Sequence, residues 1–348
     1  MSRGGRRGLR GAGPFTGRRA VTRFAQVMHV GELERAEDNC LVSAVIARYY
    51  HFLDRERGKK TMQLARSMLG PAIGDFGHVN VKELKPIIVS DWLAKQHRWN
   101  SSSQNTAISV LARAFNWAKA QGIITRNPTD GMAKPEKRVR GKEVVLPEGL
   151  QDLLIDLASE SLARFLRVLR GTGARPGEII HAECRHYRRE IGAIVFPWGP
   201  APGGYRWKTA KKTKRDRIIY LPPDLQALVE EEIGGRGGKE RIFQTVRHKP
   251  WTSNNLVNRL DKLLKHAKVK RWCRQHAFSS DKIMCYAFRH SYIARMLTAG
   301  CPIKLLADWC GTSVKMIEET YSHAHDDLQA MRRMFMQFNA AASSPPRP

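Results

Sequence analysis

The sequence predicts a mainly α-helical protein with a small β-sheet, which places it in the α+β class. Apolar residues recur at three- and four-residue steps over residues 37–122 and again after residue 250, which is the spacing of amphipathic helices. Two short segments, AIVFPW and RIIYL, are rich in β-branched and aromatic residues and predict strands. Hydrophobic residues make up 42% of the 348 positions, which is enough to form a core.

The elements follow one another with recognisable boundaries. In the first half, one helix is expected over residues 87–93, and another follows the serines at 101–103 and ends at Gly122. In the second half, a helix is expected over residues 153–169, and the two strands follow with a lysine-rich turn between them. Further helices are expected over residues 254–265, 288–297 and 328–338, and short ones on either side of Gly311.

Composition divides the chain into five segments. Residues 1–30 are predicted to be a disordered basic arm, because the first 25 positions hold seven arginines and no acidic residue. We expect a helical domain over residues 37–131 and a charged linker without periodicity over 132–146. A mixed second domain is expected over 147–338, and residues 339–348 are a disordered tail whose prolines exclude a helix.

The charge balance points to a polyanionic partner. Sixty Lys and Arg residues stand against thirty-two Asp and Glu, giving a net charge of +28. Nucleic acid is the usual partner of such a chain, while an acidic protein surface or an anionic membrane remains open. No apolar run approaches the roughly 20 residues that a membrane-spanning helix needs. The arginine-rich start lacks the apolar region of a secretory signal, so we expect a cytoplasmic protein.

The sequence excludes several kinds of chemistry. It contains no G-x-x-x-x-G-K-[ST] phosphate loop, no H-E-x-x-H and no G-x-S-x-G. Carboxylates do not cluster at metal-binding spacings, which argues against a magnesium-dependent nuclease, and we predict neither a metal nor a cofactor. One alternative stays open, because the pairs His181–Cys184 and Cys273–His276 have the spacing of half a zinc site. Their spacing is either coincidental or the sign of a shared metal.

Three segments of the second domain carry groups suited to metal-free phosphate chemistry. In GTGARPGEII, a turn bounded by glycines presents Arg175, and Glu178 can reach back to brace it. In WKTAKKTKRDRIIYL, many basic residues crowd a turn, which an anion would stabilise. In the last segment, Arg289 and Tyr321 lie on amphipathic helices. Taken alone, each segment is also compatible with a capped helix, a solvated turn or an ordinary helix face.

Together the three segments resemble the tyrosine recombinase (phage integrase) family, and the resemblance extends over almost the whole chain after the basic arm. GTGARPGE matches the family's G-x-R-x-x-E turn at Arg175. KKTKRDRIIYL places the family's hairpin lysine at Lys212, with Lys211 and Lys214 as neighbouring alternatives. The family's H-x-x-R box becomes YAFR, which ends at Arg289, and its L-G-H…Y box becomes CGT…Y, which ends at Tyr321. The helical half containing AFNWAKAQGIITRNP resembles the family's core-binding domain.

The resemblance implies a mechanism for DNA strand breakage and rejoining. Tyr321 would attack a phosphodiester to give a 3′-phosphotyrosine and a free 5′-hydroxyl, so that the bond energy stays in the protein–DNA ester. Arg175 and Arg289 would bind the non-bridging oxygens. Lys212 would protonate the departing 5′-oxygen. Tyr286 and Thr312, which stand where the family usually has imidazole or indole side chains, would donate hydrogen bonds to the phosphate.

The same resemblance implies double-stranded DNA as the partner, held between the two domains of each protomer. It also implies a homotetramer that joins two DNA sites. We expect the protein to be associated with the nucleoid. The lysines expected to contact DNA are Lys208, Lys211, Lys214, Lys268 and Lys270. The substitutions Tyr286 and Thr312 leave open a non-cleaving DNA-binding protein with this fold. Relaxation of DNA by a topoisomerase with the same chemistry is a further alternative.

Overall fold

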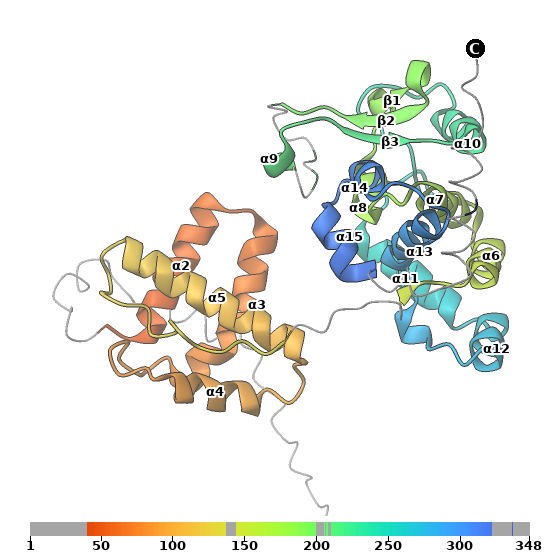
Figure 1. Cartoon of the computed structure of the whole chain (residues 1–348). Coiled ribbons are helices and arrows are strands. Elements are labelled where there is room, and N and C mark those ends of the chain that lie inside the picture. Colours follow the sequence, from red (N-terminus) through yellow and green to blue (C-terminus); the bar gives the residue numbers. More distant parts are fainter. Residues whose placement is uncertain are drawn as a thin grey trace, which may run out of the picture. The chain divides into compact units, whose positions relative to one another are not determined.

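The computed structural model describes residues 40–136, 144–199, 205, 207, 210–321 and 336. Contacts divide the chain into two compact units, residues 1–138 and 139–348 (Figure 1). The expected basic arm, the tail and almost all of the helix expected over 328–338 lie outside the described residues. The two units are therefore described separately, each from the part that the structure places.

Helices form the first unit, and they are α2 (Val42–Glu56), α3 (Lys59–Phe76), α4 (Pro86–Lys95) and α5 (Ser101–Ala120). Helix α5 begins at Ser101 and so includes the serines that it was expected to follow, because Asn100 caps it: the Asn100 side chain accepts the Ser103 backbone N–H at 2.9 Å. Phe76, Trp92 and Phe115 are fully buried in the core between the helices. The rings of Phe76 and Trp92 meet edge to face, with centroids 5.5 Å apart.

The second unit packs helices around a core and carries a three-stranded antiparallel sheet. The strands are β1 (Tyr187–Arg188), β2 (Ala193–Phe196) and β3 (Arg217–Tyr220), in that order. In the register of β2 and β3, Ile194 lies opposite Ile219 and Phe196 lies opposite Arg217. The helices are α6 (Glu148–Leu157), α7 (Glu160–Thr172), α8 (Pro176–His181), α9 (Ala210–Thr213), α10 (Pro223–Ile233), α11 (Ser253–Leu264), α12 (Ala267–Gln275), α13 (Cys285–Thr298), α14 (Ile303–Cys310) and α15 (Val314–Tyr321).

The fold class predicted from the sequence is confirmed, while two local expectations are wrong. The helix expected over residues 153–169 is two helices, because the backbone of Ala158 and Ser159 is extended and separates α6 from α7. The lysine-rich segment between the two strands reverses the chain direction as expected, because β2 and β3 pair antiparallel, and it also contains α9. Val144 and Leu146, which composition assigns to the linker, are buried in the core of the second unit.

In the part of the chain that the structure describes, every helix is too short or too polar to cross a lipid bilayer.

Candidate active site

The turn between α7 and α8 presents Arg175. Helix α7 ends at Gly173, whose φ of +60° lies in the left-handed region, and a Cβ at this position would lie 2.3 Å from the ring of Tyr292. Glu178 accepts the backbone N–H of Arg175 at 3.0 Å and its Nη1 at 2.8 Å, so the prediction that Glu178 braces this turn is confirmed. Nη2 of Arg175 donates to the carbonyl of Gly311 at 2.6 Å. The guanidinium is thus fixed by two protein acceptors, with further N–H groups left in its fork.

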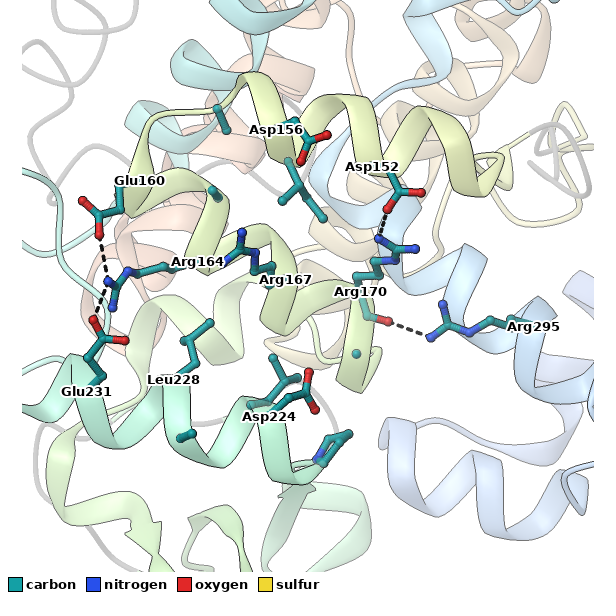
Figure 2. A pocket seen from close by; sticks show the side chains of 17 residues that line it. Asp152, Asp156, Glu160, Arg164, Arg167, Arg170, Asp224, Leu228, Glu231 and Arg295 are labelled. Atoms are coloured by element: carbon teal, nitrogen blue, oxygen red, sulfur yellow. Dashed lines mark hydrogen bonds and ion pairs between the residues drawn. The ribbon is translucent and has the colours of Figure 1, made fainter.

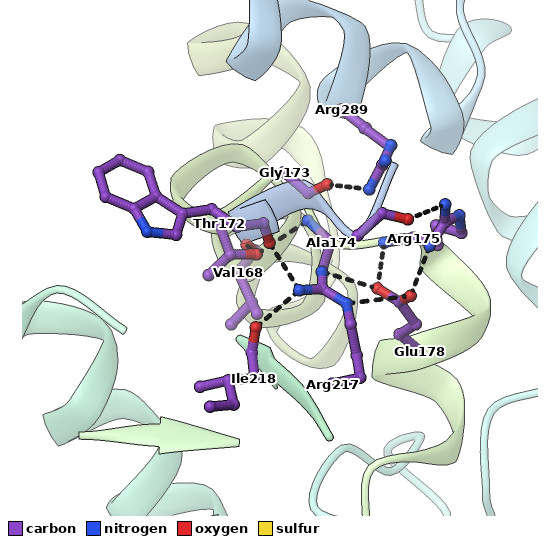
Figure 3. Close-up of polar contacts among 11 residues, drawn as sticks. Val168, Thr172, Gly173, Ala174, Arg175, Glu178, Arg217, Ile218 and Arg289 are labelled. Atoms are coloured by element: carbon purple, nitrogen blue, oxygen red, sulfur yellow. Dashed lines mark hydrogen bonds and ion pairs between the residues drawn. The ribbon is translucent and has the colours of Figure 1, made fainter. Parts of the chain in front are cut away.

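Helix α13 brings Arg289 to the same turn. Its side chain is buried, and Nη1 donates to the carbonyl of Gly173 at 2.8 Å (Figure 3). Burial and the neighbouring charge of Arg175 lower the pKa of Arg289. For Arg175, burial acts in the same direction, but the Glu178 carboxylate outweighs it and raises the pKa. The two arginines identified from the sequence therefore lie close enough to perturb each other.

A buried ion pair lies beneath Arg175. Glu178 is fully buried, and its carboxylate also accepts Nε and Nη2 of Arg217, at 3.3 and 3.2 Å (Figure 3). Arg217 begins strand β3, is 3% exposed, and donates Nη1 to the carbonyl of Trp309 at 2.6 Å. Burial raises the pKa of Glu178, but Arg217 and Arg175 more than reverse that effect and lower it. Glu178 is therefore a carboxylate shared by two arginines.

Arg217 was not predicted as a site residue. In the sequence it was grouped with the basic residues of the lysine-rich turn. One signal was available, since residues two apart in a strand face the same side. Arg217 and Ile219 share a face of β3, and both are buried. Strand periodicity therefore predicts that Arg217 points inward, where a cation needs a carboxylate partner.

The Tyr321 side chain lies at the end of α15 and is 8% exposed. Its ring packs in an apolar cluster with Ile293, Leu306 and Cys310. The hydroxyl lies 2.5 Å from Nδ1 of His290, the residue that follows Arg289 on α13. Burial raises the pKa of Tyr321 well above its usual value, although Arg289 acts in the opposite direction. The phenol is therefore next to the arginine site, and in this structure it contacts an imidazole.

Tyr286 and Thr312 belong to α13 and to the turn after α14. Tyr286 is 39% exposed on the first turn of α13, and its ring centroid is 5.9 Å from Cζ of Arg289. Tyr286 also contributes to the raised pKa of Arg175. Thr312 follows Gly311, and its backbone N–H donates to the carbonyl of Ala307 at 2.8 Å. Tyr286 therefore lies beside the arginines, and Thr312 follows the glycine whose carbonyl holds Arg175.

The basic residues expected to contact DNA have different surroundings. Lys208 lies outside the described residues, and for Lys211 and Lys212 the structure describes only the backbone, within α9. Lys214 is exposed and has a φ of +49°. On α12, Lys268 and Lys270 are exposed, while Val269 and Cys273 are buried against the unit. Helix α12 thus presents a basic face to solvent.

A groove of about 1190 Å³ lies between α6, α7 and α10, but it contains none of the predicted site residues (Figure 2). Two of the arginines that line it are paired with acids. Arg164 lies 2.7 Å from Glu160 and 2.6 Å from Glu231, and Arg170 pairs with Asp152. Because the lining also includes Asp156 and Asp224, the groove carries no excess of positive charge and suits a polyanion poorly.

The alternative of a shared zinc site is not assembled in the structure. The ring of His181 stacks on Tyr205 at 4.2 Å, and the ring of His276 stacks on Trp272 at 3.9 Å. Across the residues that the structure describes, no three His, Cys, Asp or Glu side chains gather in a way that could hold a metal ion. The two His–Cys spacings therefore do not support a zinc site.

Comparison with models of protein families shows which family this chain belongs to. The model of the phage integrase family matches residues 148–327. The chain belongs to the phage integrase family. A tyrosine recombinase of Pseudothermotoga lettingae is 22% identical over 256 residues, which cover 71% of this chain and 81% of the relative.

Solved structures of integrases share the fold of this family member. The integrase of the Tn1549 transposon, in complex with transposon right end DNA, matches with a TM-score of 0.66 and 17% identity over 85% of this chain and 99% of that chain. A lambda integrase tetramer bound to a Holliday junction matches with a TM-score of 0.60 and 15% identity, over 85% of this chain and 81% of that chain. At these identities the matches establish the fold.

Proposed function

We propose that this phage integrase family member breaks and rejoins DNA at specific sites through a covalent link between Tyr321 and a 3′-phosphate. One observation carries the proposal. Arg175, in the α7–α8 turn, and Arg289, on α13, meet at the Gly173–Arg175 turn, and the charge of Arg289 also acts to lower the pKa of the Tyr321 phenol. Two guanidinium groups beside a phenol suit an anionic, five-coordinate phosphorus.

In the proposed reaction, the Tyr321 oxygen forms a bond to phosphorus as the bond from phosphorus to the 5′-oxygen breaks. Negative charge develops on the non-bridging oxygens, where the planar forks of Arg175 and Arg289 donate hydrogen bonds. Loss of either arginine is expected to slow cleavage by a factor on the order of 10² to 10³. The phosphotyrosine conserves the bond energy, so reversal with a different 5′-hydroxyl joins new strands without ATP.

Three further residues complete the proposed site. Lys212, on α9, would protonate the departing 5′-oxygen, which would otherwise leave as an alkoxide. Tyr286 is exposed beside both arginines and would donate its hydroxyl to the phosphate. Thr312 would add a second hydroxyl, because it follows the glycine whose carbonyl holds Arg175.

The proposed substrate is double-stranded DNA, and the proposed location is the nucleoid. Four protomers would assemble on two DNA sites. The net charge of +28 and the basic face of α12 favour a polyanion. The names of the solved relatives include a complex with transposon end DNA and a tetramer on a Holliday junction. We extend both properties to this chain as part of the proposal.

A second candidate is a DNA-binding protein of the same fold that does not cleave. One observation favours it, because the Tyr321 side chain is 8% exposed and its hydroxyl contacts His290. Cleavage requires this hydroxyl to reach a phosphorus. The two candidate functions therefore differ in whether DNA binding exposes the Tyr321 hydroxyl to a phosphorus.

A nicked suicide duplex separates these candidates, because loss of a short fragment after cleavage traps the covalent complex. The protein is incubated with duplexes that cover the DNA on either side of its gene. We expect a covalent adduct with the unmodified protein and none with Tyr321→Phe, which should still bind the duplex. Tyr220→Phe, at an exposed tyrosine on β3, is the matched control and should form the adduct.

The outcomes are distinct. Binding without an adduct in the unmodified protein would reject cleavage and leave the non-cleaving candidate. An adduct in Tyr321→Phe would reject Tyr321 as the nucleophile. Exchange of strands between two duplexes would exclude simple relaxation of DNA.

A further inference from the structure

His290 is in direct contact with the proposed nucleophile. Its Nδ1 lies 2.5 Å from the Tyr321 hydroxyl oxygen, and the two ring centroids are 5.7 Å apart. The ring of Tyr286 approaches His290 with a centroid distance of 5.3 Å and an interplanar angle of 63°. The imidazole is half-buried on α13, directly after Arg289. It is therefore placed within hydrogen-bond distance of the atom that would attack phosphorus.

The Tyr321 phenol needs a proton acceptor in order to attack. A tyrosine in water has a pKa of about 10. Burial raises the pKa of Tyr321 further, and Arg289 only partly offsets this. Near neutral pH the hydroxyl is consequently protonated in the folded protein. A reaction that began only from the rare phenolate would be slow, and a base in contact with the hydroxyl removes this barrier.

The other groups that influence Tyr321 are poor proton acceptors near neutral pH. Arg289, on α13, is a cation and donates its N–H groups. Cys310, on α14, is buried, and burial raises the pKa of its thiol. Tyr286 carries a second phenol, and Arg175, from the α7–α8 turn, adds a second cation beside Arg289. An imidazole, by contrast, is a side chain that commonly serves as a general base.

We propose that His290 is a catalytic residue that accepts the phenolic proton of Tyr321 as its oxygen attacks phosphorus. The inference rests on the proposed function, because it assumes that Tyr321 is the nucleophile. The tautomer with its proton on Nε2 presents a lone pair at Nδ1 to the hydroxyl. As the bond between oxygen and phosphorus forms, the proton moves to Nδ1 and yields an imidazolium. The bond to the 5′-oxygen breaks, and that oxygen takes a proton from Lys212. In the rejoining step both protons return.

His290→Asn separates proton transfer from positioning. The amide oxygen of asparagine can still accept a hydrogen bond from the phenol, but it does not take up a proton in the accessible pH range. Cleavage is measured in single turnover on the nicked suicide duplex, with enzyme in excess over DNA at a concentration that saturates binding. His248→Asn is the matched control, because His248 is exposed in a turn and its φ of +54° suits asparagine.

We expect His290→Asn to form the adduct more slowly than the unmodified protein by a factor on the order of 10² or more, with unchanged DNA affinity. The pH profile provides the second readout. In the unmodified protein, cleavage should rise with pH and level off once the imidazole is neutral. In His290→Asn the phenolate must form from solvent, so the rate should rise about tenfold per pH unit across the range from about 6 to 9. A role in positioning alone would not change the shape of this profile.

Each other result has a separate meaning. If the unmodified protein and His248→Asn form no adduct, the proposed function fails and not merely this inference. If the adduct forms equally fast in His290→Asn, or faster, the role of His290 as proton acceptor is rejected while the nucleophile stands. A slow variant whose pH profile still levels off near neutrality would assign the proton to a different acceptor.

Discussion

At the scale of single residues, Arg217 connects three parts of the candidate site. Its guanidinium binds Glu178, which in turn holds Arg175, and it donates to the carbonyl of Trp309 at the end of α14. The residue itself begins strand β3 and is almost completely buried. A buried cation without its carboxylate would be strongly unfavourable, and the converse holds for the carboxylate. Arg217 therefore fixes the position of Arg175 without touching the proposed substrate.

We expect Arg217→Leu to lower the free energy of unfolding of the second unit by about 3 to 5 kcal/mol, because it leaves the buried carboxylate with one partner. Arg189→Leu is the matched control. Arg189 pairs with Glu230 at 3.0 Å on the surface, where the arginine side chain is 78% exposed, and its loss should cost less than about 1 kcal/mol. Urea unfolding followed by tryptophan fluorescence measures both. Equal losses would contradict this role.

The sequence predicts some residues of the site better than others, for a physical reason. Arg175 lies in a turn that glycines mark, so its exposure to a ligand follows from local pattern. His290 and Arg217 acquire their roles from contacts with Tyr321 and Glu178, which lie 31 and 39 positions away in the chain. Contacts between residues so far apart in the chain cannot be predicted from a single sequence. Lys212 stays a prediction, because the structure describes only its backbone.

At the scale of elements, the turn between α14 and α15 holds Arg175 and leads into the helix that carries Tyr321. Gly311 forms this turn with a φ of +61°, and its carbonyl accepts Nη2 of Arg175. A Cβ at Gly311 would lie 2.8 Å from Nε of Arg217, whose guanidinium is held by Glu178 and Trp309. The turn thus needs glycine both for its backbone conformation and for space.

Gly311→Ala is therefore expected to displace Arg217 and to slow adduct formation at least tenfold, in addition to the roughly 1 kcal/mol that a left-handed alanine costs. Gly235→Ala is the control, since Gly235 also has a positive φ, +81°, but a Cβ there would meet nothing within 4 Å. The control should lose stability alone. Single-turnover cleavage and urea unfolding of the two variants measure the difference. The steric account would be wrong if both variants cleaved DNA at the same rate.

Helix α12 makes a separate prediction about DNA affinity. Lys268 and Lys270 are exposed on this helix, and each phosphate contact releases about one counterion. Replacing both with glutamine should weaken binding to all sequences and reduce the slope of log affinity against log salt by about 2. The double variant Lys239→Gln with Lys249→Gln removes two exposed lysines from loops and should change the slope less. Titrations at several salt concentrations test this, and identical slopes would remove α12 from the interface.

Periodicity predicts the class of most elements correctly, and it fails where tertiary contacts set a boundary. The apolar pattern over residues 153–169 is continuous, and the break is marked only by Ser159 as N-cap and Glu160 in the first turn of α7. Helix α9, between β2 and β3, has only four residues, so it has no repeating apolar face from which it could be predicted. Longer helices, such as α5, show their period over several turns and are predicted reliably.

At the scale of the whole molecule, the stability of the second unit depends on groups that are buried in one charge state. His186 is buried against Phe196, and its Nδ1 accepts the backbone N–H of Glu183 at 3.1 Å. Burial lowers its pKa to about 4. The unfolded chain, with an imidazole pKa of about 6.5, binds the proton more readily. The stabilising effect of the neutral form is therefore present above about pH 6.5 and is lost as the pH falls toward 4.

Between pH 7 and pH 5 this group alone should lower the free energy of unfolding by roughly 2 kcal/mol. His186→Gln retains an acceptor for the Glu183 N–H but does not titrate, so its stability should change less over the same range. Glu178 also has a lowered pKa, but its stabilising effect is lost only below the usual carboxyl range near pH 4. Urea unfolding at the two pH values checks the prediction. Parallel losses in both proteins would assign the pH dependence to other groups.

If Tyr321 is the nucleophile, its hydroxyl oxygen becomes bonded to DNA, and this bond can be mapped. The adduct trapped on a suicide duplex is digested with nuclease and protease, and the peptide that retains a nucleotide is sequenced by mass spectrometry. We expect one modified residue, Tyr321, joined to a 3′-phosphate, together with a free 5′-hydroxyl on the released strand. A nucleotide on any other residue, or a 5′-phosphate link at Tyr321, would contradict this expectation.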